Sequence, residues 1–114
     1  MSDPRYRPRD FTYEPRAFGY ATDIRWKEAT TDREADLIEA SRIQHYFALL
    51  IRRRIRDEQI PMNRYVTKAG DTYDRISRIL RGTAIMRFED VARADRILGN
   101  IIEEALPEPD HLPD

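Results

Sequence analysis

Between residues 32 and 106 the apolar positions recur at the spacing of helices. From 32 to 57 they return every three or four residues, which predicts one long amphipathic helix with an N-cap at Thr31 or Asp32. Shorter periodic runs, broken by proline and glycine, predict four further helices over 62–69, 73–81, 88–98 and 101–106. Gly70 and Gly82 stand where the second and third helices would end. The pattern therefore predicts an all-α domain of five helices.

The first 31 residues have no helical periodicity, yet they hold six of the eleven aromatic residues. Four apolar residues share a period of two: Phe18, Tyr20, Ile24 and Trp26. A period of two is typical of a strand, so this segment would pair with residues 11–14 as a hairpin, pair with another chain, or drape over the helices. We therefore divide the chain into an N-terminal extension over 1–31, a helical domain over 32–106 and an extended tail over 107–114.

The net charge of −1 conceals an uneven distribution. Residues 42–82 carry ten positive and four negative charges, whereas residues 83–114 carry three positive and eight negative ones. A basic middle of this kind is typical of a surface for an anionic partner, although a solvated helix face would look the same. No apolar run is long enough for a membrane span, and the arginine-rich start lacks the apolar core of a secretory signal. We expect a cytoplasmic protein.

Catalytic and metal chemistry find little support in the composition. The chain has no cysteine, which excludes disulfides, thiol nucleophiles and zinc–thiolate sites. Of the two histidines, His45 falls within the long helix, where we expect it to be a packing residue, and His111 lies in the tail. No glycine-rich phosphate loop, His-Glu-x-x-His motif or nucleophile triad is present. We therefore expect a protein that is not an enzyme and that uses no metal or cofactor.

Residues 60–82 contain the pattern of a helix-turn-helix motif, with two short helices joined at Gly70 and the second ending at Gly82. This stretch resembles the Xre / λ-repressor–Cro family of DNA-binding domains, whose spacing it matches without a gap. The matching positions are Ile60, Tyr65, Val66, Ala69, Gly70, Thr72, Ile76, Ser77, Arg78, Ile79, Arg81 and Gly82. The resemblance covers residues 42–106 and implies a λ-repressor-like fold. It also implies a bacterial or phage-encoded, nucleoid-associated transcriptional repressor that binds palindromic double-stranded DNA as a homodimer.

The resemblance also assigns DNA contacts by position in the motif. The expected base contacts are Tyr73, Asp74, Arg75 and Arg78. The expected phosphate contacts are Asn63, Arg64, Lys68, Thr72, Ser77, Arg81, Thr83 and Arg87. A second interpretation of Asp74 is that its negative charge stabilises the N-terminus of its helix through the helix dipole. Departures from the family pattern occur at Met62, Asp71, Leu80 and Asp95, and they bear on base readout more than on fold.

Two further basic segments are candidates for DNA contact. Residues 52–56 read Arg-Arg-Arg-Ile-Arg, and one or two of these arginines would reach phosphate because a helix cannot aim all four in one direction. Residues 5–9, Arg-Tyr-Arg-Pro-Arg, have the composition of a minor-groove arm, although such runs are also common in tails.

A homodimer needs an apolar surface outside the DNA face, and the sequence offers two. The favoured one is the extension, with Phe18, Tyr20, Ile24 and Trp26; the other is the fifth helix, with Ile101, Ile102 and Leu106. If the extension is the interface, a chain without residues 1–27 should fold as a monomer. Two alternative functions stay open: an antitoxin-type protein that binds a partner protein and regulates its own synthesis, and a protein adaptor that has lost DNA binding.

Overall fold

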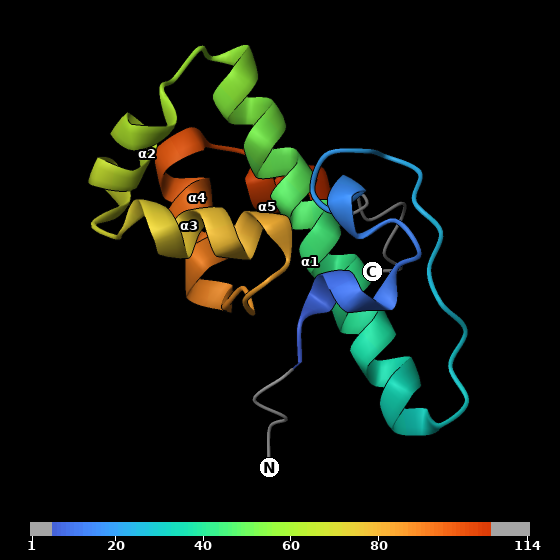
Figure 1. Ribbon diagram of the computed structural model, residues 1–114. Coiled ribbons are helices and arrows are strands. Elements are labelled where there is room, and N and C mark those ends of the chain that lie inside the picture. Colours follow the sequence, from blue (N-terminus) through green and yellow to red (C-terminus); the bar gives the residue numbers. More distant parts are fainter. Residues whose placement is uncertain (1–5, 106–114) are drawn as a thin grey trace, which may run out of the picture.

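The structure, a computed structural model, describes residues 6–105. Its elements are two 3-10 helices, η1 (Pro8–Phe11) and η2 (Pro15–Ala17), and five α-helices, α1 (Asp32–Asp57), α2 (Met62–Ala69), α3 (Tyr73–Arg81), α4 (Phe88–Leu98) and α5 (Ile101–Ala105) (Figure 1). The all-α prediction is confirmed, and so are the predicted bounds of the first four α-helices. The predicted tail over 107–114 lies outside the described residues, as do Leu106 and His111. Between residues 6 and 105, no helix is both long enough and apolar enough to cross a membrane.

The helix ends form where local chemistry satisfies the backbone. The Thr31 hydroxyl oxygen accepts a hydrogen bond from an N–H in the first turn of α1 at 3.0 Å, and the Thr72 hydroxyl caps α3 in the same way at 3.1 Å. Gly70 ends α2 with φ of 66° and Gly82 ends α3 with φ of 76°. Both values lie in the left-handed region, which glycine enters at little cost. These four residues therefore set the boundaries that the sequence pattern predicts.

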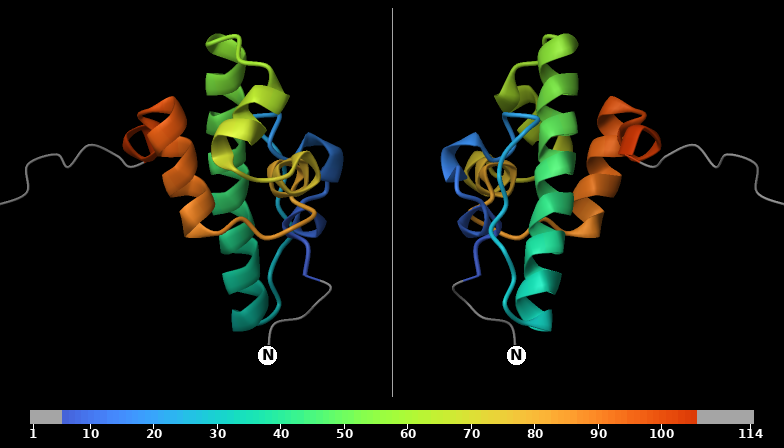
Figure 2. Two further views of the ribbon diagram at one scale, coloured as in Figure 1. Left: turned by 90° about the vertical axis from the view of Figure 1, so that its left-hand side faces the viewer. Right: turned by 90° about the vertical axis from the view of Figure 1, so that its right-hand side faces the viewer.

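The long helix α1 runs through the middle of the molecule. In Figure 2, α3 and the N-terminal segment lie on one side of α1, while α4 and α5 lie on the other. One apolar core joins these layers, and every α-helix contributes buried residues to it, such as Ile51 from α1, Tyr65 from α2, Leu80 from α3, Ala94 from α4 and Ile101 from α5. Because α3 packs against this core along one side only, its other side is left for solvent or a ligand.

The N-terminal segment packs on its own helices. Its backbone pairs with itself through an isolated antiparallel bridge between Thr12 and Trp26, so hairpin-like pairing and draping over the helices both occur. Phe18 is only 1% exposed and belongs to the core. Its ring fills the space beside Gly82, where an added Cβ would lie 2.7 Å from a ring carbon. The assignment of Phe18 to a dimer interface is therefore wrong, since its side chain is already buried within the chain.

Polar contacts fix the same segment to the helices. The Gly19 N–H donates to Nδ1 of His45 at 2.8 Å, and the His45 ring packs against the rings of Phe18 and Trp26 at centroid distances of 5.3 and 5.6 Å. The Arg9 N–H donates to the backbone oxygen at the end of α3, 3.0 Å away. Deleting residues 1–27 would remove these contacts and Phe18 from the core. This packing argues against the expectation that the truncated chain folds alone.

Candidate nucleic-acid interface

The two faces of α3 differ in character. Ile76, Ile79 and Leu80 are buried in the core. On the opposite side Tyr73 is 59% exposed, and the side chain of Arg78 is 53% exposed. Asp74 and Arg81 are exposed too, so the outer face combines the aromatic ring of Tyr73 with charged groups. This combination of a firmly packed inner face and a polar outer face suits a helix that reads a groove of DNA.

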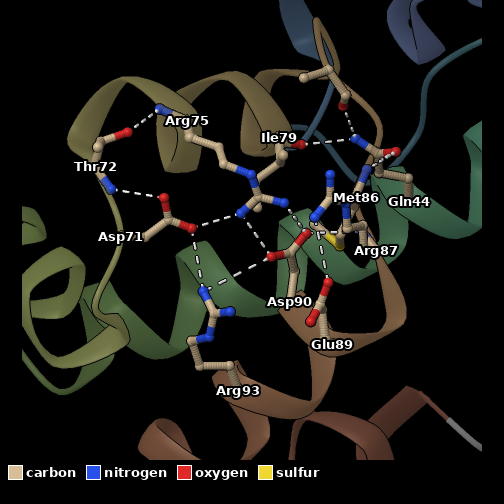
Figure 3. Close-up of polar contacts among 11 residues, drawn as sticks. Gln44, Asp71, Thr72, Arg75, Ile79, Met86, Arg87, Glu89, Asp90 and Arg93 are labelled. Atoms are coloured by element: carbon tan, nitrogen blue, oxygen red, sulfur yellow. Dashed lines mark hydrogen bonds and ion pairs between the residues drawn. The ribbon is translucent and has the colours of Figure 1, made fainter.

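Arg75 does not belong to that outer face. Its guanidinium makes two hydrogen bonds to the carboxylate of Asp90, each of 2.8 Å, and a third to Asp71 at 2.6 Å (Figure 3). The Arg75 side chain is 30% exposed and that of Asp90 only 2%. The expected base contact by Arg75 is contradicted, because its charged group is held within the chain between the turn and α4.

The carboxylates around Arg75 form a network that anchors the N-terminal half of α3. Arg93 of α4 reaches Asp71 at 3.2 Å, and Asp90 accepts a hydrogen bond from the Arg87 N–H at 2.8 Å. Burial alone would raise the pKa of Asp71, but the Thr72 N–H and the two guanidinium groups outweigh it and hold that pKa below its ordinary value. Hydrogen bonds to Asp90 in turn raise the pKa of Arg75. The departure from the family pattern at Asp71 thus has a structural role.

Gln44 of α1 holds the other end of α3. Its Nε2 donates to the carbonyl oxygens of Ile79 and Ala84 at 2.9 and 2.8 Å, and its Oε1 accepts from the Met86 N–H at 2.9 Å (Figure 3). One buried side chain therefore joins α1 to the last turn of α3 and to the loop that follows. The periodicity of α1 gave no sign of this role, because it depends on residues some forty positions away.

The expected phosphate contacts fall into two groups along the chain. Asn63, Arg64 and Lys68 are exposed on α2, which precedes the turn into α3. The second group begins at the N-cap of α3, where Thr72 caps the helix; within α3, Ser77 is half-buried and Arg81 is exposed. After α3, the Thr83 hydroxyl donates to the Arg78 carbonyl at 3.3 Å, and Arg87 pairs with Glu89 at 3.4 Å. The exposed cations of the two groups are Arg64 and Lys68 on α2, Arg81 at the end of α3 and Arg87 just before α4.

The arginines of residues 52–56 are largely used inside the chain. Arg52 lies over the Tyr20 ring at 3.9 Å from its centroid, and Arg53 donates to the Thr22 hydroxyl at 2.6 Å. Arg54 donates to the Leu98 carbonyl at 2.8 Å. Arg56 is exposed, next to Asp57 at 3.2 Å. Of the four, Arg56 is the freest to meet a phosphate.

The expected arm is attached to α1 over its described part. Arg5 lies outside the described residues, but the Tyr6 hydroxyl lies 2.9 Å from that of Ser41, and Pro8 is buried. Arg7 is exposed and Arg9 half-buried. From residue 6 onward this segment is part of the folded body, which contradicts its assignment as a free minor-groove arm.

The remaining residues expected at a dimer interface mostly pack within the chain. Ile101 is buried in the core, which contradicts its assignment, while Trp26 and Ile102 are half-buried against the core. Ile24 is half-buried as well. Asp95 accepts a hydrogen bond from the Ile102 N–H at 3.0 Å and so holds α5 against α4. Tyr20 is exposed, but the guanidinium of Arg52 packs over its ring.

Within residues 6–105, no three histidine, aspartate or glutamate side chains are grouped so that they could hold a metal ion. Comparisons of the chain with protein-family models, with curated proteins and with solved structures give no match.

Proposed function

We propose that this protein is a sequence-specific double-stranded DNA-binding regulator of transcription with a λ-repressor-like helix-turn-helix fold. In this proposal it acts as a homodimer on palindromic sites and represses by occluding a promoter. The observation that carries the proposal is the outer face of α3: Tyr73 and Arg78 are more than half exposed on a helix that is fastened at both ends. A helix of this kind can enter the major groove without reorganising.

Arg78 is the principal candidate for reading a base. Its only charged partner among the described residues is Asp74, at 3.4 Å and itself exposed, and such a surface pair contributes little. Arg78 can therefore leave Asp74 and bond to O6 and N7 of guanine, an interaction worth about 1–3 kcal/mol of discrimination. Tyr73 lies five residues earlier, at the start of the same helix, and offers a hydroxyl and a ring edge.

Phosphate contacts come from the exposed cations on either side of α3. Arg64 and Lys68 lie on α2, and Arg81 lies in the last turn of α3. Contacts of this kind set the register of the helix on the duplex and make the affinity depend on salt. Arg75, which was expected to contact a base, is left out of the DNA contacts, since its guanidinium holds α3 on α4 through Asp90.

The test is selection of duplexes from a random pool by the purified protein at two salt concentrations. We expect enrichment of a palindromic sequence, with weaker retention of all sequences at the higher salt. Arg78→Ala should relax the preference at one base pair of each half-site. Arg96→Ala, which removes an exposed arginine from α4, is the matched control and should leave the preference unchanged. Absence of any enriched sequence at both salt concentrations would overturn the proposal.

A further inference from the structure

An apolar groove lies between α1 and the loop that joins α3 to α4. It has a volume of about 230 Å³, and the side chains that line it include Ile43, Phe47, Ile85, Met86 and Phe88. We call it the α1–α4 groove. Phe88 is 91% exposed, and Ile43 and Ile85 are exposed too. Exposed large apolar side chains that lie together around one hollow, rather than singly, are typical of interaction sites.

The loop that presents these side chains is held in place. Gln44 accepts from the Met86 N–H and donates to the Ala84 carbonyl, at 2.9 and 2.8 Å. At the end of the same loop, the Arg87 N–H donates to the buried Asp90 of α4 at 2.8 Å. Ile85 and Phe88 are therefore displayed by a backbone that is fixed before any partner arrives. A preordered apolar surface loses little conformational freedom on association.

We propose that two copies of this chain associate through the α1–α4 groove, with Phe88 of each copy inserted into the groove of the other. The surface is self-complementary in shape, because the same patch carries a protruding ring and an apolar hollow. A twofold axis requires this property, since it brings identical patches together. A partner with a different surface would have no need of both features.

Charge at the edges of the groove also fits a second copy. Next to the lining residue Ile43 on α1, Arg42 pairs with Glu39 at 3.2 Å, and beside the loop the lining residue Arg87 pairs with Glu89 at 3.4 Å. Each edge thus holds one charge of each sign, so two identical surfaces meet without net repulsion. A neutral, apolar surface of this kind is unsuited to nucleic acid, which selects clustered cations.

This inference rests on the proposed function, for which it names the surface that joins the two copies. None of the residues that line the groove belongs to α2 or α3, so association would leave Tyr73 and Arg78 free for DNA. It replaces the two surfaces expected from the sequence, the N-terminal extension and the fifth helix. Association can be measured without DNA, which separates the fate of this inference from that of the proposed function.

Sedimentation velocity of the full chain over a range of concentrations is the test. We expect a monomer–dimer equilibrium in which Phe88→Glu raises the dissociation constant at least about 30-fold, the size that marks an interface hot spot. Tyr13→Glu, which changes another exposed aromatic residue on the N-terminal segment, away from the groove, is the matched control and should not shift the equilibrium. Circular dichroism and thermal unfolding of both variants establish that they fold.

Three results would overturn the inference: a wild-type chain that stays monomeric throughout, a Phe88→Glu variant that dimerises as the wild type does, or a groove filled by a synthetic peptide of residues 106–114. A dimer that is lost with Phe88→Glu but enriches no DNA sequence would support the interface and contradict the proposed function. Enrichment of a palindrome by a dimer that tolerates Phe88→Glu would support the proposed function and contradict the interface.

Discussion

Replacing Arg75 by methionine should destabilise the fold rather than change the DNA sequence that is preferred. Arg75 gives Asp90 two hydrogen bonds of 2.8 Å, and the Asp90 side chain is 2% exposed. Removing one partner of a buried ion pair costs about 3–5 kcal/mol, because the other charge stays buried without compensation. Here Asp90 keeps the Arg87 N–H at 2.8 Å and Arg93 at 4.0 Å. We therefore expect a smaller loss of about 2–3 kcal/mol, just below that range.

Urea unfolding followed by far-UV circular dichroism measures this loss. For a chain of this size it corresponds to a fall in the midpoint of about 1–2 M with an unchanged slope. Arg78→Met is the matched control, because Arg78 lies on the same helix but pairs with Asp74 on the surface. Its effect on the free energy of unfolding should stay below about 1 kcal/mol.

A double-mutant cycle with Asp90→Asn isolates the interaction itself. The loss in the double variant should be smaller than the sum of the two single losses by about 1–3 kcal/mol. If Arg75→Met unfolds at the same urea concentration as the wild type, and instead changes the base preference of the protein, the structural role assigned to Arg75 is refuted.

Three further predictions concern other parts of the chain. Burial lowers the pKa of His45 below its ordinary 6.5, so its imidazole takes up a proton more readily in the unfolded chain, and stability should fall as the pH drops below 6.5. The thermal midpoint of the wild type should therefore decrease between pH 7.5 and 5.5 by more than that of His45→Gln. Gly82→Ala should cost more in urea unfolding than Gly70→Ala, by about 1–3 kcal/mol, because both glycines have positive φ but only Gly82 has a ring carbon within 2.7 Å of the added Cβ. Replacing Arg64 and Lys68 together by glutamine should flatten the log–log salt dependence of DNA binding by up to ~2 units, and an unchanged slope would place them away from the duplex.

The helices were predictable from the sequence because their signals are local. Thr31 and Thr72 cap helices through an N–H three residues away, and Gly70 and Gly82 end helices through their own backbone angles. The apolar period of α1 likewise reflects burial along one helix. A reader of the sequence needs no knowledge of distant contacts to place such elements.

The site was less predictable because its key contacts join residues far apart in the chain. Arg75 sits at a position that a motif reads as outward, but Asp90, fifteen residues later, captures its guanidinium. The only local sign was Asp71, four residues before Arg75, at the spacing of a helical ion pair. The prediction for Phe18 was wrong for a similar reason, since the strand-like period of its segment does not reveal that it packs beside Gly82.

Backbone amide chemical shifts of the ¹⁵N-labelled protein, recorded with and without the duplex that selection enriches, test the central claim most directly. DNA docked on the outer face of α3 should change the amide chemical shifts of α2 and α3, including those of Lys68, Tyr73 and Arg78. The amide chemical shift of Glu103 in α5 should stay unchanged. Shifts confined to α5 or to the α1–α4 groove, or no shifts at any duplex concentration, would contradict DNA recognition by α3.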